Sequence, residues 1–297
     1  MIRSWRGTFT AIVTPFKRDG SLDEAALRTL IDRQIEGGVD GIVPCGTTGE
    51  SVTMSTAERI RVIEIVREQS NDRVRVLAGA GGNSTAAVVT LAKQIDQVSV
   101  DGILIVVPYY NKPTQEGLYQ HFATVADAVE APVVMYNVPG RTSANMTAET
   151  ALRLAEHGNI VGTKEASGAL TQVMEIIRGA PAGFSILSGE DNLAVPIIAL
   201  GGHGVVSVVS NEAPAMMSEM VRSALEGKMT EARELHYQLL GLMNVNFIET
   251  NPIPVKAALA MMGLIEEQYR LPLVPMAEAN RKKLHLELMK LDLVAAP

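Results

Sequence analysis

Eight short runs of apolar, β-prone residues, spread along the first two-thirds of this 297-residue chain, constrain its fold more than any other feature. The runs are Thr8–Val13, Gly41–Pro44, Val74–Ala78, Gly102–Val107, Pro132–Tyr136, Asn159–Thr163, Phe184–Leu187 and Val205–Val209. Most are separated by amphipathic stretches with apolar residues at helical spacing, such as Leu22–Glu36, Ala57–Glu68 and Leu118–Val129. Strands that are apolar throughout and alternate with helices predict a parallel sheet covered by helices on both faces.

Eight strand-helix repeats favour an α/β fold whose sheet closes on itself, a (β/α)8 TIM barrel. The alternative is an open, doubly wound sheet. That fold would be expected to carry a GxGxxG motif after its first strand, where this chain has Thr14, Pro15 and Phe16. Helical patterns alone follow Asn211, at about Ala213–Glu226, Glu231–Val245, Val255–Met262 and Met276–Leu291. We therefore expect a catalytic barrel over residues 1–225 and a C-terminal helical extension over residues 226–297, packed on the barrel.

Composition excludes several classes of partner and site. The net charge of −7 and the lack of a Lys/Arg-rich patch argue against nucleic-acid binding. No apolar run is long enough for a membrane helix, and the first sixteen residues lack a signal peptide's apolar core, so we expect a cytoplasmic protein. The single cysteine and five histidines form no metal-binding pattern, so we expect no metal site.

Polar residues gather where the predicted strands end, which is the rim that carries catalytic groups in barrels of this kind. Lys164 follows the apolar run Asn159–Thr163, and exclusion of water there would lower the pKa of its amine and make it a nucleophile. The alternative is a structural lysine that pairs with Glu165 or reaches solvent. Position alone favours this structural role, so the surrounding residues must decide.

Three neighbouring segments favour catalysis. Tyr136 ends the preceding strand and could bring a proton-transferring phenol beside the amine. Thr47 and Thr48, between two glycines, offer hydroxyl and backbone N–H groups that suit a carboxylate. Arg141, in a turn-rich loop after Tyr136, could hold a second carboxylate through its guanidinium. Each of these signals is weak alone, since core aromatics, Gly-Thr turns and surface arginines are common.

Taken together, the segments Gly46–Glu50, Tyr136–Pro139 and Lys164–Ala166 resemble the dihydrodipicolinate synthase/N-acetylneuraminate lyase family. The resemblance covers nearly the whole chain, from Ala11–Phe16 to Asn251–Lys256. It implies a TIM-barrel lyase in which Lys164 forms an imine with pyruvate. The protonated imine would act as the electron sink, so neither a metal nor an organic cofactor is expected. Arg141 is typical of the members that condense pyruvate with L-aspartate-4-semialdehyde, at the entry to lysine and diaminopimelate biosynthesis.

The resemblance also implies roles for single residues. Thr48 would hold the pyruvate carboxylate, and Arg141 the carboxylate of the semialdehyde. Thr47, Tyr136 and Tyr110 would form a proton relay, with Tyr110 supplied by a neighbouring subunit of a homotetramer built as a dimer of dimers. Gly189 and Val206 would contribute backbone groups.

A lysine effector site is implied at Ser51, Asn83 and Tyr109, but this chain departs from the pattern of feedback-inhibited relatives. Ala87 stands where they have a glutamate, and Thr56 and Arg59 where some have histidines. Without the anionic partner, a bound lysine ammonium would be poorly compensated. The departure therefore predicts weak or absent inhibition by lysine.

Two alternatives stay open at this point. The chain could be a pyruvate-dependent aldolase or lyase of the same family that acts on another aldehyde or a sugar acid. It could also be a non-catalytic oxo-acid sensor, which the retained polar residues disfavour.

Overall fold

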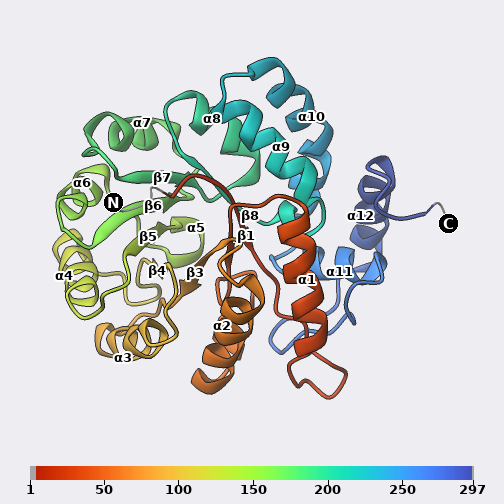
Figure 1. The fold of residues 1–297 in the computed structure, drawn as a ribbon, viewed down its shortest axis with the longest axis horizontal. Helices are drawn as coiled ribbons and strands as arrows, with labels where there is room; N and C mark the ends of the chain where they lie inside the picture. Colours follow the sequence, from red (N-terminus) through yellow and green to blue (C-terminus); the bar gives the residue numbers. More distant parts are fainter. Residues whose placement is uncertain (1–4, 296–297) are drawn as a thin grey trace.

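The computed structural model describes residues 5–295, and its eight parallel strands close into a barrel in chain order (Figure 1). The strands are β1 (Gly7–Ala11), β2 (Gly41–Val43), β3 (Arg75–Gly79), β4 (Gly102–Val106), β5 (Val133–Asn137), β6 (Ile160–Glu165), β7 (Ser185–Ser188) and β8 (Gly204–Ser207). Each predicted strand is confirmed, with ends displaced by two residues at most. The predicted TIM barrel is confirmed as well, since β8 pairs with β1 and leaves the sheet no open edge.

Helices surround the strands, and the figure shows them as an outer ring. They are α1 (Glu24–Glu36), α2 (Thr56–Ser70), α3 (Thr85–Asp96), α4 (Gln115–Ala126), α5 (Pro139–Thr142), α6 (Ala148–Ala155), α7 (Leu170–Gly179), α8 (Ala194–Ala199) and α9 (Pro214–Leu225), followed by α10 (Met229–Val245), α11 (Ile253–Met261) and α12 (Glu278–Lys290). Short 3-10 turns lie at Ser51–Thr53, Asp191–Leu193 and Val209–Asn211. Within residues 5–295, no helix combines the length and apolar character needed to cross a membrane.

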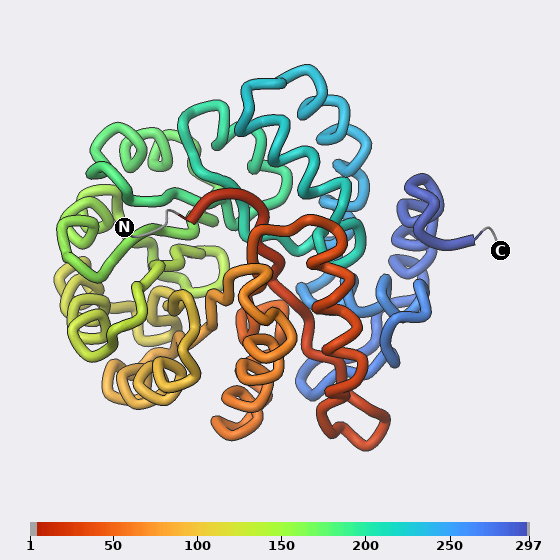
Figure 2. Tube along the Cα trace, in the orientation of Figure 1, coloured from red at the N-terminus to blue at the C-terminus, as the bar shows by residue number. Residues whose placement is uncertain are grey.

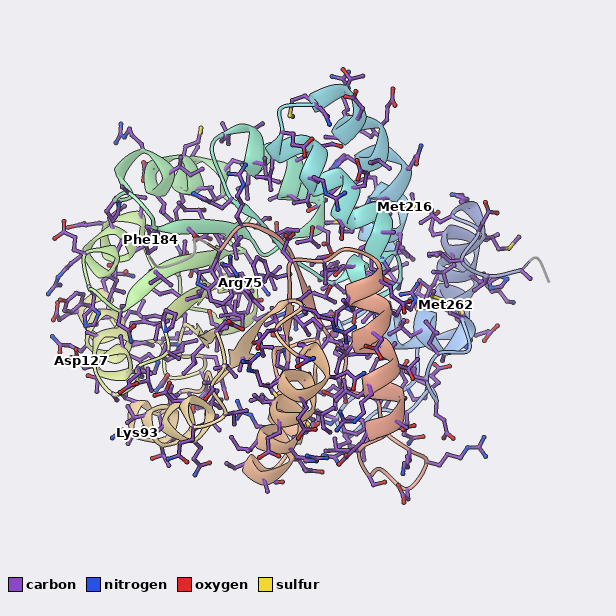
Figure 3. All side chains as sticks on the ribbon, viewed as in Figure 1. Arg75, Lys93, Asp127, Phe184, Met216 and Met262 are labelled. Carbon is purple, nitrogen blue, oxygen red and sulfur yellow. The ribbon has the colours of Figure 1, made fainter. Side chains whose placement is uncertain are left out.

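Alternation along each strand divides the core into two parts, because successive side chains point to opposite faces. In β4, Ile103 and Ile105 belong to the apolar layer shared with the outer helices, whereas Leu104 belongs to the cluster that includes Phe9 and Leu187 from other strands. Both faces of the sheet are thus buried, which is why these strands are apolar throughout. Arg75 lies at the centre of the view in Figure 3 and stacks on Trp5, 5.5 Å from the ring centroid.

A second apolar cluster joins the last barrel helix to the C-terminal helices. Met217 and Met220 of α9, Leu242 of α10, and Leu284 and Leu288 of α12 are all buried in it. Figure 2 shows α1 and α9 side by side, where the chain closes the ring of helices, and α12 at the outer edge. We propose that residues 226–297 act as an extension of the barrel, because apolar side chains of α10, α11 and α12 share a core with α9.

Candidate active site

A cavity of about 220 Å³ opens at the carboxyl ends of the strands, where the polar strand ends were predicted to meet. Several of the predicted site residues line it, namely Thr47, Ser51, Tyr109, Tyr136, Arg141 and Lys164. Apolar side chains from the barrel interior, such as Val43 and Leu104, form much of the remaining wall. The cavity therefore combines a few polar groups with largely apolar walls.

Lys164 lies on β6 with 7% of its surface exposed, directly opposite Tyr136 in the register of β5 and β6. Its Nζ is 4.1 Å from the centroid of the Tyr136 ring. Burial lowers the pKa of the Lys164 amine to about 7, which the Asp191 carboxylate opposes and the Arg141 guanidinium reinforces. At neutral pH a large fraction of this amine is therefore unprotonated and able to attack a carbonyl carbon.

Glu165 is not the partner of Lys164, so the structural pairing considered from the sequence is wrong. Adjacent strand residues face opposite sides of the sheet. The Glu165 carboxylate instead accepts hydrogen bonds from Asn137 Nδ2 at 3.2 Å and from the Ser167 N–H at 2.9 Å. Across residues 5–295, no carboxylate oxygen lies within 4.0 Å of Lys164 Nζ. The amine thus lacks the ion pair that normally accompanies a buried lysine.

The Tyr136 phenol is buried beside the amine, and burial raises its pKa, so it stays protonated and can donate a hydrogen bond. The nearby Thr47 side chain partly offsets this shift. Thr47 and Tyr136 thus place two hydroxyl groups at the cavity that Lys164 faces. Such hydroxyl groups can carry a proton to or from an atom bound at the amine.

Thr48 follows the lining residue Thr47 but is not itself in the cavity lining. Its surface is 3% exposed, and its Oγ1 accepts a hydrogen bond from Asn251 Nδ2 at 3.0 Å. The segment that carries Thr47 and Thr48 is flanked by Cys45 and Glu50, whose φ angles of 56° and 52° are in the left-handed region. Residues with a Cβ rarely adopt this conformation, and where they do they commonly mark a functional turn.

Gly189 follows β7 and lies against the Lys164 side chain. A Cβ atom at this position would be 3.0 Å from Lys164 Cε and 2.7 Å from Ala166 Cβ, so only glycine leaves the lysine undisturbed. Its N–H already donates to the Glu165 carbonyl at 2.8 Å, which leaves its own carbonyl as the group available to a ligand. Val206 is buried in β8, opposite Phe9 of β1, and does not line the cavity.

Arg141 lies on the short helix α5 rather than in the open loop expected from the sequence. Pro139 begins this helix, a position where proline is favoured because its fixed φ suits the first turn. Arg141 is exposed and lines the mouth of the cavity. Its guanidinium can therefore meet a substrate carboxylate at the entrance while remaining in contact with water.

Tyr110 does not reach the cavity of its own chain. It is 88% exposed, is absent from the cavity lining, and has a left-handed φ of 75°. Of the residues implied as an effector site, Ser51 and Tyr109 line one side of the cavity. The Asn83 carbonyl accepts a hydrogen bond from Asn111 Nδ2 at 2.9 Å. Tyr110 and Asn83 are therefore not among the residues that line the cavity, whereas Ser51 and Tyr109 are.

Comparison with known proteins identifies the family. The model of the dihydrodipicolinate synthetase family matches residues 4–291. The chain belongs to this family. A 4-hydroxy-tetrahydrodipicolinate synthase of Koribacter versatilis is 55% identical over 280 residues, which span 94% of this chain and 93% of the relative. This membership makes the chain an enzyme, a lyase.

Solved structures of the family agree with the fold. The dihydrodipicolinate synthase of Aquifex aeolicus superimposes with a TM-score of 0.96 at 45% identity, covering 99% of this chain and all of the other. A structure described as the first monomeric dihydrodipicolinate synthase variant superimposes with a TM-score of 0.95 at 43% identity, covering 97% of both chains. The family barrel is therefore also known in a monomeric variant.

Two buried polar residues beside this family site were not singled out from the sequence. The charge of Asp191 raises the pKa of Lys164, and its Oδ2 accepts hydrogen bonds from the N–H groups of Val208 and Val209. Its place just after β7 was a usable signal, because charged residues at strand ends belong to the catalytic rim. Asn251 had no such signal, since it meets Thr48 across 203 residues of sequence.

Proposed function

We propose that the chain catalyses the Schiff-base aldol condensation of pyruvate with L-aspartate-4-semialdehyde to give 4-hydroxy-tetrahydrodipicolinate. We place this reaction in lysine and diaminopimelate biosynthesis in the cytoplasm, without a metal or organic cofactor. One observation carries the proposal. It is the unpaired, buried amine of Lys164, with a pKa of about 7, which faces a cavity and lies 4.1 Å from the ring centroid of Tyr136.

In the first stage, the neutral Lys164 amine attacks C2 of pyruvate, and the resulting carbinolamine loses water to give a protonated imine. Thr48 holds the pyruvate carboxylate through its hydroxyl and backbone N–H groups, with the Gly189 and Val206 backbones beside it. Tyr136 and Thr47 supply and remove the protons that these steps require. The positive imine then withdraws electrons from the methyl carbon, which loses a proton and becomes an enamine.

In the second stage, the enamine carbon attacks the aldehyde of L-aspartate-4-semialdehyde, whose carboxylate is held by Arg141. The new C–C bond converts the aldehyde into a hydroxyl group. The amino group of the same substrate then attacks the imine carbon, closes a six-membered ring and expels Lys164. One water molecule is released in total, during formation of the first imine.

The proton relay is completed by Tyr110 of a neighbouring subunit in a homotetramer, a dimer of dimers. This assignment is supported by the high exposure of Tyr110 and by its absence from the lining of its own chain's cavity. A monomeric variant exists among the solved relatives, so the assembly must be measured in solution for this chain.

Borohydride reduction in the presence of pyruvate tests the proposal. It should trap one pyruvate-derived adduct, which peptide mass mapping should place on Lys164. Lys93 serves as an internal comparison, because it lies on α3 at the periphery of the molecule (Figure 3). An adduct on Lys93, Lys112 or Lys256 instead, or none at all, would contradict the mechanism.

The acceptor is tested by comparing turnover of pyruvate plus L-aspartate-4-semialdehyde with cleavage of N-acetylneuraminate. The first reaction should dominate, and Arg141→Ala should raise the KM for the semialdehyde. Removal of a charged hydrogen bond of this kind costs about 1.5–3 kcal/mol, or roughly tenfold to a hundredfold in kcat/KM. A change in kcat with unchanged semialdehyde KM would count against the role of Arg141. A protein that forms the pyruvate adduct but catalyses neither the condensation nor the cleavage of N-acetylneuraminate would be an oxo-acid sensor.

A further inference from the structure

The C-terminal extension holds both halves of the Thr47–Thr48 turn through buried polar contacts. Asn251 Nδ2 donates to Thr48 Oγ1 at 3.0 Å, and Lys256 Nζ lies 2.5 Å from Glu50 Oε1. The Arg270 N–H donates to the other carboxylate oxygen of Glu50 at 3.2 Å. No more than 4% of the surface is exposed in any of the four residues that make these side-chain contacts, namely Thr48, Glu50, Asn251 and Lys256. The turn at the substrate cavity is therefore fixed from residues about 200 positions later in the chain.

The contact between Asn251 and Thr48 has a direction. The amide Nδ2 can only donate, so the Thr48 hydroxyl oxygen accepts and keeps its own proton for another acceptor. Within residues 5–295, no group accepts that proton. Asn251 Oδ1 is itself buried without a partner, so Thr48 is the only hydrogen-bond partner of this side chain in the described part of the chain. The amide is thus committed to one threonine hydroxyl.

The backbone of the turn needs such support. Cys45 and Glu50 both carry a Cβ and adopt left-handed φ angles, which persist only where surrounding contacts enforce them. The ion pair with Lys256 and the N–H of Arg270 hold Glu50 at one end. At the centre of the turn, the contact from Asn251 determines which way the hydroxyl of Thr48 can point.

We propose that Asn251 is a positioning residue for the oxo-acid substrate. By donating to Thr48 Oγ1, it occupies an oxygen lone pair and leaves the hydroxyl proton free to bond the substrate's carboxylate. This inference rests on the proposed function, in which Thr48 holds the carboxylate of pyruvate. Asn251 does not touch the reacting atoms, and its effect passes through Thr48.

Two substitutions separate this role from a merely structural one. Asn251→Ala removes the donor and should raise the pyruvate concentration that gives half-maximal borohydride trapping by about fivefold to tenfold. Asn251→Asp is nearly the same size, but its carboxylate would accept the Thr48 proton and place a negative charge near the substrate's carboxylate. It should therefore raise that concentration by about fiftyfold or more. Asn280→Ala is the matched control, because Asn280 donates to Glu249 in the same extension and should have no effect.

Acetone, a ketone without a carboxylate, provides the specificity test. Trapping of acetone at Lys164 should change by less than about twofold in Asn251→Ala, Asn251→Asp and Asn280→Ala, because acetone offers no carboxylate that Thr48 could bind. In a Thr48→Val background, Asn251→Ala should add less than about twofold to the pyruvate effect, since its target hydroxyl is already gone. Equal losses with acetone and pyruvate, or independent effects in the double variant, would overturn the inference. Unchanged pyruvate trapping in the Asn251 variants would overturn the role of Asn251 and leave the proposed function intact. A wild-type protein that forms no pyruvate adduct would refute the proposed function as well.

Discussion

Two buried lysines, Lys164 in the cavity and Lys256 in the C-terminal extension, both lie against aromatic rings but differ in ion pairing and in access to the cavity. Each packs its ammonium against an aromatic ring, 4.1 Å from the Tyr136 centroid for Lys164 and 4.5 Å from the Phe16 centroid for Lys256. Burial lowers the pKa of both amines. The difference is Glu50, whose carboxylate is 2.5 Å from the Lys256 amine, whereas no carboxylate pairs with Lys164 among the described residues.

Burial alone does not make a lysine amine nucleophilic, as the contrast between Lys164 and Lys256 shows. For Lys256, the Glu50 carboxylate opposes the effect of burial on the pKa and favours the protonated form, which cannot attack a carbonyl. Lys256 also has no exposed surface, whereas Lys164 opens onto the cavity. A nucleophilic lysine thus needs burial, the absence of an ion pair and access for a substrate. A buried lysine that lacks the last two properties is a structural element.

Replacement of Lys164 by methionine, of similar volume, should give the largest loss of activity. The condensation rate should fall by about 10³-fold or more, equivalent to at least about 4 kcal/mol of transition-state stabilisation. The free energy of unfolding should stay the same or rise, because a buried amine without a partner is removed. Steady-state kinetics and chemical unfolding of the same preparation would measure both. If the variant kept its turnover, Lys164 would not be the nucleophile and the contrast with Lys256 would be wrong.

Lys256→Met should have the opposite profile. It leaves the Glu50 carboxylate buried without a partner, so the free energy of unfolding should fall by about 3–5 kcal/mol. The protein that remains folded should still trap pyruvate at Lys164. A double variant that also carries Glu50→Leu should recover most of the lost stability. Full stability in the single variant would mean that the ion pair is not structural.

Gly189→Ala tests whether Lys164 depends on the space beside it. The added Cβ would lie 3.0 Å from Lys164 Cε, so the amine must shift, and a shift of this size can cost roughly a hundredfold in rate. The rate of adduct formation with pyruvate should fall more than the stability of the fold. Gly158→Ala is the control, since a Cβ at that position has no neighbour within 4 Å. Equal losses in the two variants would exclude a specific effect on Lys164.

The pH profile of imine formation should sharpen the contrast between the lysines. With a pKa of about 7, the neutral fraction of Lys164 increases about tenfold between pH 6 and pH 8 and then levels off. Asp191 holds this pKa up, so Asp191→Asn should move the midpoint to lower pH. Borohydride trapping at a series of pH values measures both effects. A rate that keeps rising tenfold per unit up to pH 10 would indicate an ordinary lysine.

The sequence predicts well what depends on local periodicity. Apolar runs such as Gly102–Val107 identified the strands, because both faces of a barrel strand are buried and the pattern lies within a few residues. Tyr136 and Lys164, which face each other across β5 and β6, could be brought together by the same reasoning, since barrel order makes consecutive strands neighbours. The prediction that Arg141 lies in a loop was less accurate, because the four-residue helix that Pro139 begins has the amino-acid composition of a turn.

The contacts that the sequence did not predict are long-range and polar. Nothing near Thr48 indicates Asn251, and nothing near Glu50 indicates Lys256, because more than 200 residues separate each pair. Such pairs are determined by how the C-terminal extension packs on the barrel, which periodicity does not encode. The position of Glu165 was readable in principle, since alternation along a strand directs it away from Lys164. Its partners, Asn137 and Ser167, emerged only from the structure.

Inhibition by free lysine extends the comparison to an ammonium group supplied by a ligand. An ammonium bound near Ser51, Asn83 and Tyr109 would need an anion, as Lys256 needs Glu50, but the neighbouring helix α3 presents Ala87. We therefore expect lysine at millimolar concentration to change the condensation rate by less than about twofold, the smallest effect among these predictions. Ala87→Glu would add a carboxylate to this exposed position and should make the enzyme more sensitive to lysine. Initial condensation rates of the unsubstituted enzyme and of Ala87→Glu, measured over a range of lysine concentrations, would test both expectations. Half-maximal inhibition of the unsubstituted enzyme below a millimolar would show that an ammonium is tolerated there without a carboxylate.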